Sequence, residues 1–189
     1  MPPTAPATKS RLTETAARLF RQKGYHGTGL AEILAESGVP KGSLYHHFPA
    51  GKADLAVAAA RWASAGMLGI IDDAFTPAAD FTGGATTLCF KLAKLFDLYP
   101  DWRGCPISSV LFDGPENESF RAVAAEIFES WRHRVETHAL RLGLAPEAAR
   151  RQAEHLMFLV QGGWTQARAR QSGDVLRGLP AFFGPLTET

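Results

Sequence analysis

Apolar residues recur at helical spacing along almost the whole chain. In the first such segment Leu12, Ala16, Leu19 and Phe20 stand at positions i, i+4, i+7 and i+8, which places them on one stripe of an amphipathic helix. No stretch alternates apolar and polar residues in the way that a half-buried strand does. The pattern therefore predicts an all-α protein.

Stop and start signals divide this pattern into separate helices. Gly24 is a predicted C-terminal stop, Thr28 a predicted N-cap, and Pro40 can open a helix because its missing N–H would be unpaired there. The predicted helices cover about residues 8–23, the segment between Thr28 and Ser37, 40–47, 53 into the 70s, 84–99, a short piece within 102–113, 120–142, 146–170 and 174–183.

No Ser/Gly-rich linker and no internal repeat interrupts the chain. A small N-terminal unit is therefore expected to lead directly into a larger helical bundle. We assign residues 1–7 to a disordered tail, 8–56 to a three-helix unit and 57–189 to the bundle.

The segment from Thr28 to Leu55 has the pattern of a helix-turn-helix: two short helices are separated by a turn that contains Gly38. In the second helix Leu44 and Phe48 stand four residues apart and can anchor it to the other two helices. Its opposite face carries small, basic and hydrogen-bonding residues, which suit close approach to DNA. These residues are Lys41, Gly42, Ser43, Tyr45 and His46.

This segment resembles the TetR family of transcriptional regulators. The matching residues are Thr28, Ile33, Gly38, Val39, the run Lys41–Phe48 (KGSLYHHF), Lys52 and Leu55. Three residues, Pro49 to Gly51, precede Lys52, one more than is usual in the family. That spacing, and the run 104–111 with Asp113, resemble the LmrA/YxaF-like branch.

The resemblance implies two sets of DNA contacts. The expected phosphate contacts are Thr28, Lys41, Tyr45, His47 and Lys52. The expected base-edge contacts or close approaches are Pro40, Lys41, Gly42, Ser43, Tyr45 and His46. For Thr28 and Lys52 the physics agrees, because both stand near a helix N-terminus, where free N–H groups favour a phosphate.

Other interpretations of this face stay open. Tyr45 could be a partly buried packing residue, and His46 and His47 could be solvated surface histidines or metal ligands. Adjacent residues face different sides of a helix, which disfavours chelation of one metal by both histidines.

For the C-terminal bundle the resemblance implies ligand binding and dimerisation. Aromatic residues gather in the middle of the chain beside isolated polar ones, as in apolar ligand pockets, although a stripe at helical spacing is also typical of plain core. The candidate pocket residues are Phe90, Phe112, Trp131, Phe158, Gln161 and Trp164.

Two adjacent glycines inside a predicted helix need a reason, since each costs about 1 kcal/mol relative to Ala. A kink, room for a ligand or the close approach of another helix would each supply one. The resemblance favours the last two, because the final helices of the family build its dimer interface. The candidate interface residues are Gly162, Gly163, Val175, Leu179 and Phe182.

The charged residues are informative only when they are counted separately for the two parts of the chain. The 189 residues carry 20 basic and 19 acidic groups, a net of +1, which argues against a uniformly basic DNA-binding protein. Residues 1–56, however, carry seven basic and four acidic groups, a net of +3, and the remainder is net −2. The positive charge therefore lies on the first 56 residues, the unit that contains the helix-turn-helix.

Composition excludes several classes of protein. Cys89 and Cys105 cannot form a disulfide scaffold, and both are expected to be small buried hydrophobes. We find no signal sequence and no membrane-spanning run, and we expect a cytoplasmic protein with no membrane partner, metal or cofactor.

Enzyme activity is disfavoured because no catalytic motif is present. Asp72 and Asp73 diverge on a helix, and His133 and His138 have the wrong spacing for one helical face. The sequence thus predicts a ligand-responsive transcriptional regulator: most often a repressor that binds a pseudo-palindromic operator as a homodimer and is released by a small apolar or aromatic effector. A ligand carrier or interaction module that does not bind DNA is the alternative, and activation rather than repression stays open.

Overall fold

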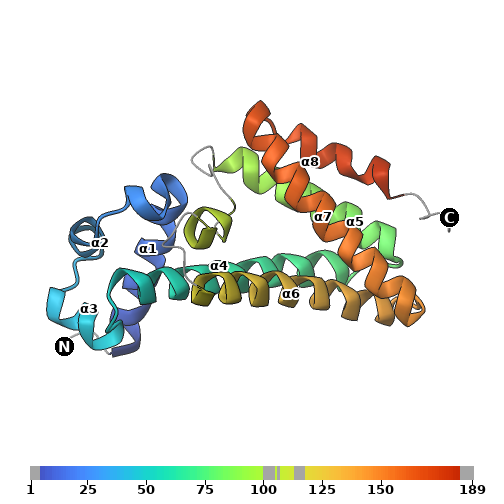
Figure 1. The fold of residues 1–189 in the computed structure, drawn as a ribbon. Coiled ribbons are helices and arrows are strands. Elements are labelled where there is room, and N and C mark those ends of the chain that lie inside the picture. The colour runs from blue at the N-terminus through green and yellow to red at the C-terminus, as the bar shows by residue number, and fades with distance from the viewer. Residues whose placement is uncertain (1–4, 100–104, 106, 113–117, 184–189) are drawn as a thin grey trace. The chain divides into compact units, whose positions relative to one another are not determined.

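The computed structural model describes residues 5–99, 105, 107–112 and 118–183, and every regular element in these ranges is helical, as predicted (Figure 1). The elements are α1 (Ala5–Gly27), α2 (Leu30–Ser37), α3 (Lys41–His47), α4 (Lys52–Phe75), α5 (Phe81–Leu98), η1 (Ser108–Phe112), α6 (Glu118–Arg141), α7 (Pro146–Arg170), α8 (Asp174–Gly178) and η2 (Leu179–Phe182). Residues 5–7, assigned to the tail from the sequence, are helical instead, and the rest of that tail lies outside the described residues.

Two compact units make up the chain. The first comprises residues 1–66 and 101–127, and the second comprises 67–100 and 128–189. This grouping differs from a single boundary after residue 56, because η1 and the start of α6 pack against α1. The Tyr25 and Phe120 rings, for example, meet edge to face with their centroids 5.7 Å apart. Both α4 and α6 contribute residues to each unit.

The predicted stop at Gly24 is a sharp turn within α1. Gly24 has φ 71° and ψ 176°, a conformation that glycine adopts without steric cost, and one more helical turn follows it. The predicted N-cap at Thr28 is wrong, because α2 is preceded by Gly29 and has no side-chain cap. The Thr28 hydroxyl instead donates to the Gly24 carbonyl oxygen at 2.8 Å and so closes the turn.

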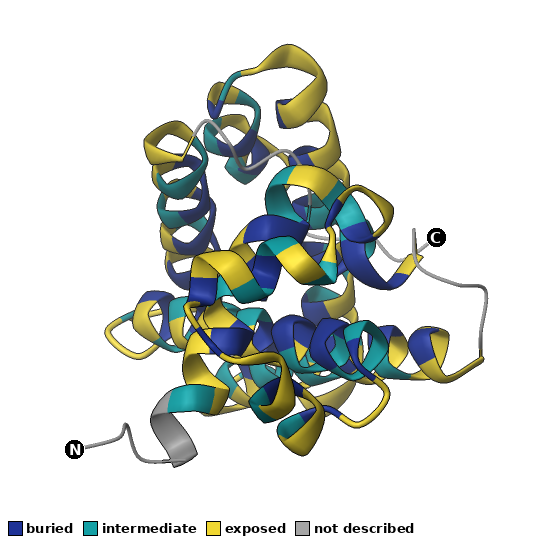
Figure 2. Ribbon diagram, turned by 90° about the vertical axis from the view of Figure 1, so that its left-hand side faces the viewer, coloured by how far each residue is buried: buried dark blue, intermediate teal, exposed yellow. Residues whose placement is uncertain are grey.

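The core of the first unit follows the predicted stripe. Leu12, Ala16, Leu19 and Phe20 are all buried on α1. Ile33, Leu44, Phe48 and Leu55 of the following segments are buried as well, and α1 packs against α2 and α3. Along each helix the buried positions alternate with exposed ones at helical spacing (Figure 2).

The core of the second unit contains Leu88, Cys89 and Leu92 of α5 together with Leu156 of α7. Burial raises the pKa of the Cys89 thiol to about 12, so this residue is a small hydrophobe, as expected. A Cβ added at Gly84 would lie 2.3 Å from Cδ1 of the buried Phe75. The glycine therefore allows α5 and the end of α4 to approach closely.

One helix of the described residues, α4, is long and apolar enough to cross a membrane by length and composition. Core helices of soluble proteins meet the same criterion. Leu55, Ile71 and Phe75 of α4 are fully buried against other parts of the chain.

The contact at Gly84 makes a prediction about stability. Gly84→Ala should lower the free energy of unfolding by about 1–3 kcal/mol, because the buried Phe75 ring would have to move. Gly69→Ala on α4 is the matched control, since a Cβ there meets nothing within 4 Å. It should stabilise the helix by about 0.5–1 kcal/mol. Urea unfolding at one protein concentration measures both, and equal effects would contradict the packing argument.

Candidate nucleic-acid interface

The short helix α3 is held in place by two side chains from one of its faces. Seven residues are too few for a helix to persist alone in water, so packing must stabilise it. Leu44 and Phe48 are both buried, as predicted from their spacing. At the N-terminus the Pro40 carbonyl accepts hydrogen bonds from the N–H groups of Ser43 and Leu44, at 3.0 and 3.3 Å.

The opposite face of α3 is open to solvent. Pro40, Lys41, Gly42, Tyr45 and His46 are exposed, and a Cβ at Gly42 would meet nothing within 4 Å. Ser43 and His47 are half-buried at the edges of this face. Tyr45 is 44% exposed, and one edge of its ring lies near Gly51. The structure thus brings seven of the nine predicted DNA contacts together on one short helix and the residue before it.

The two histidines at the end of α3 do not form a metal site. Their ring centroids are 5.0 Å apart with the planes at 69°, and only His46 is fully exposed. Within the part of the chain that the structure describes, no group of three His, Cys, Asp or Glu side chains could hold a metal ion.

The turn between α3 and α4 fixes the backbone of Lys52. Gly51 has φ 65°, and its N–H donates to the Phe48 carbonyl oxygen at 2.8 Å. The Asp54 carboxylate accepts from the Ala50 N–H at 2.7 Å. The extra residue before Lys52 is therefore accommodated by an ordered turn, and Lys52 is the first residue of α4, beside the unpaired N–H groups of that helix.

The side chain of Lys52 lies over an aromatic ring. Its Nζ is 4.3 Å from the centroid of the Tyr25 ring, within the range of a cation–π interaction. Burial lowers the pKa of Lys52 and raises the pKa of the Tyr25 hydroxyl. Sequence analysis did not identify Tyr25, which follows the predicted stop at Gly24 and lies outside the apolar stripe of α1.

Thr28 does not lie on this surface. Its side chain is 1% exposed, and its hydroxyl donates to the Gly24 carbonyl. The phosphate contact expected from Thr28 therefore has no support in this conformation. The physical reason is that the turn at Gly24 supplies an acceptor closer than any ligand could be.

Some basic side chains of the first unit are already paired with carboxylates and are therefore poor candidates for phosphate contacts. Arg18 pairs with Glu36 and Lys23 with Glu32, linking α1 to α2, and the Lys23 ammonium lowers the pKa of Glu32. Lys41 makes no ion pair with any described residue. Its charge is therefore available to a phosphate.

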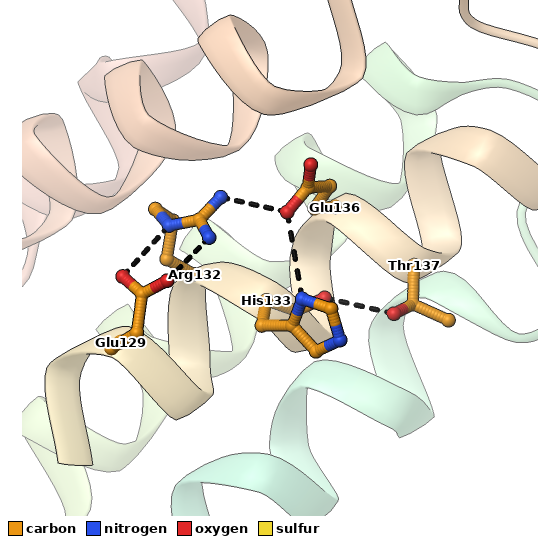
Figure 3. A network of polar contacts seen from close by, with 5 residues as sticks. All are labelled: Glu129, Arg132, His133, Glu136 and Thr137. Atoms are coloured by element: carbon orange, nitrogen blue, oxygen red, sulfur yellow. Dashed lines mark hydrogen bonds and ion pairs between the residues drawn. The ribbon is translucent and has the colours of Figure 1, made fainter. Parts of the chain in front are cut away.

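The acidic pair and histidines of the second unit have ordinary partners. Asp72 binds Arg134 and the Nε2 of His138, the latter at 2.8 Å, whereas Asp73 lies 3.6 Å from Lys91. The two carboxylates diverge, as expected. His133 belongs instead to a row of polar contacts along α6, which Figure 3 shows.

In that row Arg132 lies between two carboxylates. Its Nε donates to Glu129 at 2.9 Å and its Nη1 to Glu136 at 2.7 Å. The Nδ1 of His133 is 3.5 Å from Glu136. These i, i+3 and i, i+4 contacts stabilise one helix and present no catalytic constellation.

The six predicted pocket residues differ in their unit and in their burial. Phe112 belongs to the first unit and the other five to the second. Trp131 and Trp164 are buried beside Phe128 and Phe96, whereas Phe90 and Phe158 are exposed. The stripe is thus partly core, as the alternative interpretation held.

The five predicted interface residues do come together. All five line one open groove of ≈ 700 Å³ between α7, α8 and η2, where Phe158 also lies. Gly163 and Leu179 form its floor, since a Cβ at Gly163 would be 2.8 Å from Cδ1 of Leu179. Gly163 is therefore required for a close approach within the chain, whereas Gly162 is exposed and has open space around it.

Comparison with known proteins agrees with this geometry. Residues 12–59 match the family model "Bacterial regulatory proteins, tetR family", and residues 85–180 match "Transcriptional regulator LmrA/YxaF-like, C-terminal domain". The HTH-type transcriptional regulator YxaF of Bacillus subtilis is 31% identical over 82% of each chain. The chain belongs to the TetR family of transcriptional regulators.

A second relative from Bacillus subtilis, the HTH-type transcriptional regulator LmrA, is 30% identical over 82% of this chain and 83% of its own. The TetR fold is also found in solved structures. Reduced Escherichia coli NemR superposes with a TM-score of 0.80 at 22% identity, covering 93% of this chain and 94% of its own. Bacillus subtilis FadR, solved in complex with stearoyl-CoA, superposes with a TM-score of 0.71 at 13% identity, covering 95% and 99%.

Membership of the TetR family confirms three expectations: an all-α fold, a helix-turn-helix for DNA binding, and a role in transcription regulation rather than catalysis. TetR regulators bind DNA, usually as dimers, and bind ligands. The exposed polar face of α3 lies within the residues, 12–59, that match the N-terminal model of the family.

The exposed charge of Lys41 predicts a salt effect. Lys41→Ala should weaken binding to any duplex and reduce the slope of log K against log salt by about 1, because one fewer phosphate is neutralised. Fluorescence anisotropy on a random-sequence duplex measures the slope. Lys94→Ala, which removes an exposed lysine of α5, is the control and should leave the slope unchanged. An unchanged slope in Lys41→Ala would remove Lys41 from the phosphate contacts.

Proposed function

We propose that this TetR-family protein is a cytoplasmic repressor that binds a pseudo-palindromic operator as a homodimer and is released by a small apolar or aromatic effector. The observation that carries the DNA-binding half of the proposal is the division of α3 into two faces. Leu44 and Phe48 hold the helix, and the opposite face presents Lys41, Gly42 and Tyr45 to solvent.

The chemistry of the exposed face fits the edges of base pairs. Gly42 leaves the helix backbone uncovered, so α3 can enter a major groove closely. Ser43 and His46 can donate and accept hydrogen bonds at base edges, whereas Lys41, Tyr45, His47 and Lys52 suit phosphates. Substitution of Ser43 or His46 is thus expected to alter the preference for one DNA sequence over another. Substitution of Lys41 or Lys52 is expected to lower the affinity for every sequence.

Dimerisation is supported by the groove between α7, α8 and η2. Its apolar floor is open, and the aromatic side chains of Phe158 and Phe182 at the same site are 68% and 63% exposed. A hollow beside Gly162 and projecting rings on one patch make the surface self-complementary, which a two-fold interface requires. Two copies of α3 would then read two half-sites.

The effector half of the proposal rests on the LmrA/YxaF-like C-terminal match and on the aromatic side chains of the second unit. The resemblance to the LmrA/YxaF-like branch implies a response to planar aromatic compounds or antibiotics, whereas the structural neighbour FadR is solved with stearoyl-CoA, a long apolar ligand. An effector that binds better to a state with altered half-site spacing would shift the population away from DNA.

Footprinting tests operator binding and release together. We expect a protected pseudo-palindrome in the promoter beside the gene for this protein, and loss of protection on addition of a planar aromatic compound such as a flavonoid. Stearoyl-CoA in a parallel series distinguishes an acyl ligand from an aromatic one. Absence of any protected palindrome would contradict operator binding, and protection unaffected by either class of compound would contradict the proposed effector.

A point substitution tests the dimer without disturbing the protomer. Gly162→Arg should give monomers, because Gly162 has open space in the single chain but would face the partner subunit in the dimer. Light scattering after size exclusion measures the mass, and circular dichroism verifies the helical content. Gly66→Arg, at an exposed position of α4 with open space around it, is the matched control, and this variant should remain a dimer. A dimeric Gly162→Arg variant would show that the groove is not the interface.

A further inference from the structure

Tyr25 lies in a cluster of rings that fixes its position. It stacks on Phe20 with centroids 5.8 Å apart and planes at 18°. The ring of Phe120 meets it edge to face at 5.7 Å, and that of His26 at 5.5 Å. Only 8% of Tyr25 is exposed, so the ring has little freedom to move.

The face of the Tyr25 ring contacts a cation, the ammonium of Lys52. Lys52 is half-buried, and its Nζ lies 4.3 Å from the ring centroid. Since burial raises the pKa of Tyr25, the ring is a neutral phenol whose negative π face attracts the ammonium. The contact leaves the ammonium partly open to solvent, where a second partner can bind it.

The backbone of Lys52 is held independently. The hydrogen bond from Gly51 to Phe48 joins the start of α4 to the end of α3, and the Leu55 N–H donates to the Gly51 carbonyl at 3.1 Å. A Cβ at Gly51 would lie 3.4 Å from Cε1 of Tyr45, so the turn is packed against the exposed face of α3. The remaining freedom of Lys52 is that of its own four-carbon side chain.

We infer that Tyr25 is a positioning residue for DNA binding: its ring holds the Lys52 ammonium in place for a phosphate contact. A free lysine side chain loses rotamer entropy when it binds a phosphate, whereas one already restrained by an aromatic face loses less. The inference rests on the proposed DNA contact of Lys52. Because Phe120 is in the first turn of α6, the position of the ring also depends on that helix.

A double-mutant cycle tests whether Tyr25 acts through Lys52. Tyr25→Leu should raise the Kd for a random-sequence duplex about threefold to tenfold at ~0.15 M salt. In a Lys52→Met background the same substitution should change the Kd less than about twofold, since no ammonium remains to be positioned. Equal effects in the two backgrounds would overturn the inference.

Two controls separate positioning from folding. Tyr25→Phe keeps the ring and should bind DNA within about twofold of the wild type. Leu12→Ala removes a buried side chain of α1 but leaves the rings around Tyr25 in place, so it should reduce the free energy of unfolding without changing the coupling in the cycle. Loss of coupling in the Leu12→Ala background, with Tyr25→Phe binding DNA as weakly as Tyr25→Leu, would assign the effect to the fold instead.

A measurement without DNA covers the case in which Tyr25→Leu fails to fold. The ε-methylene protons of Lys52 should show an upfield ring-current shift in the NMR spectrum of the wild type and of Tyr25→Phe. Random-coil shifts there would overturn the inference even if the chain binds DNA. A wild-type chain that binds no duplex would overturn the proposed function together with the inference, and binding with an additive cycle would overturn the inference alone.

Discussion

The surface that fits DNA depends on the burial of Leu44 and Phe48. A helix of seven residues has too few internal hydrogen bonds to offset the loss of chain entropy, so its existence depends on these two side chains. Because these two side chains occupy one face, the other face is not needed for the core and can carry Gly42, Lys41 and Tyr45. Function and stability are thus divided between two sides of a helix of about two turns.

Periodicity predicted the elements where one face of a helix is buried and the other is wet. The stripe from Leu12 to Phe20, and the spacing of Leu44 and Phe48, needed only helical geometry. The same spacing predicts the exposed face of α3, which consists of the residues on the side opposite Leu44 and Phe48. Gly162 and Gly163 line the groove at α7, and adjacent glycines, which are costly in a helix, are the sequence signal for such a close approach or open space.

The misses occurred where the decisive contact is distant in sequence or lies in an irregular turn. Thr28 has the residue type of an N-cap, but the turn at Gly24 places a carbonyl within reach of its hydroxyl. The Tyr25 ring packs against Phe120, which is 95 positions further along the chain. The aromatic residues proposed as a pocket share a composition, and composition alone does not separate the buried Trp131 from the exposed Phe158.

Both α4 and α6 supply residues to each of the two units, and this limits how the protein can be divided. A segment cut after residue 66 would lack η1 and Phe120, which cover α1 and the edge of the Tyr25 ring. The unit that contains the helix-turn-helix therefore cannot be transferred to another protein as one continuous N-terminal segment. A chimera that exchanges operator preference between two such regulators therefore needs both stretches of the first unit, residues 1–66 and 101–127. If only the first stretch is exchanged, the recipient needs a residue at position 120 that packs against Tyr25.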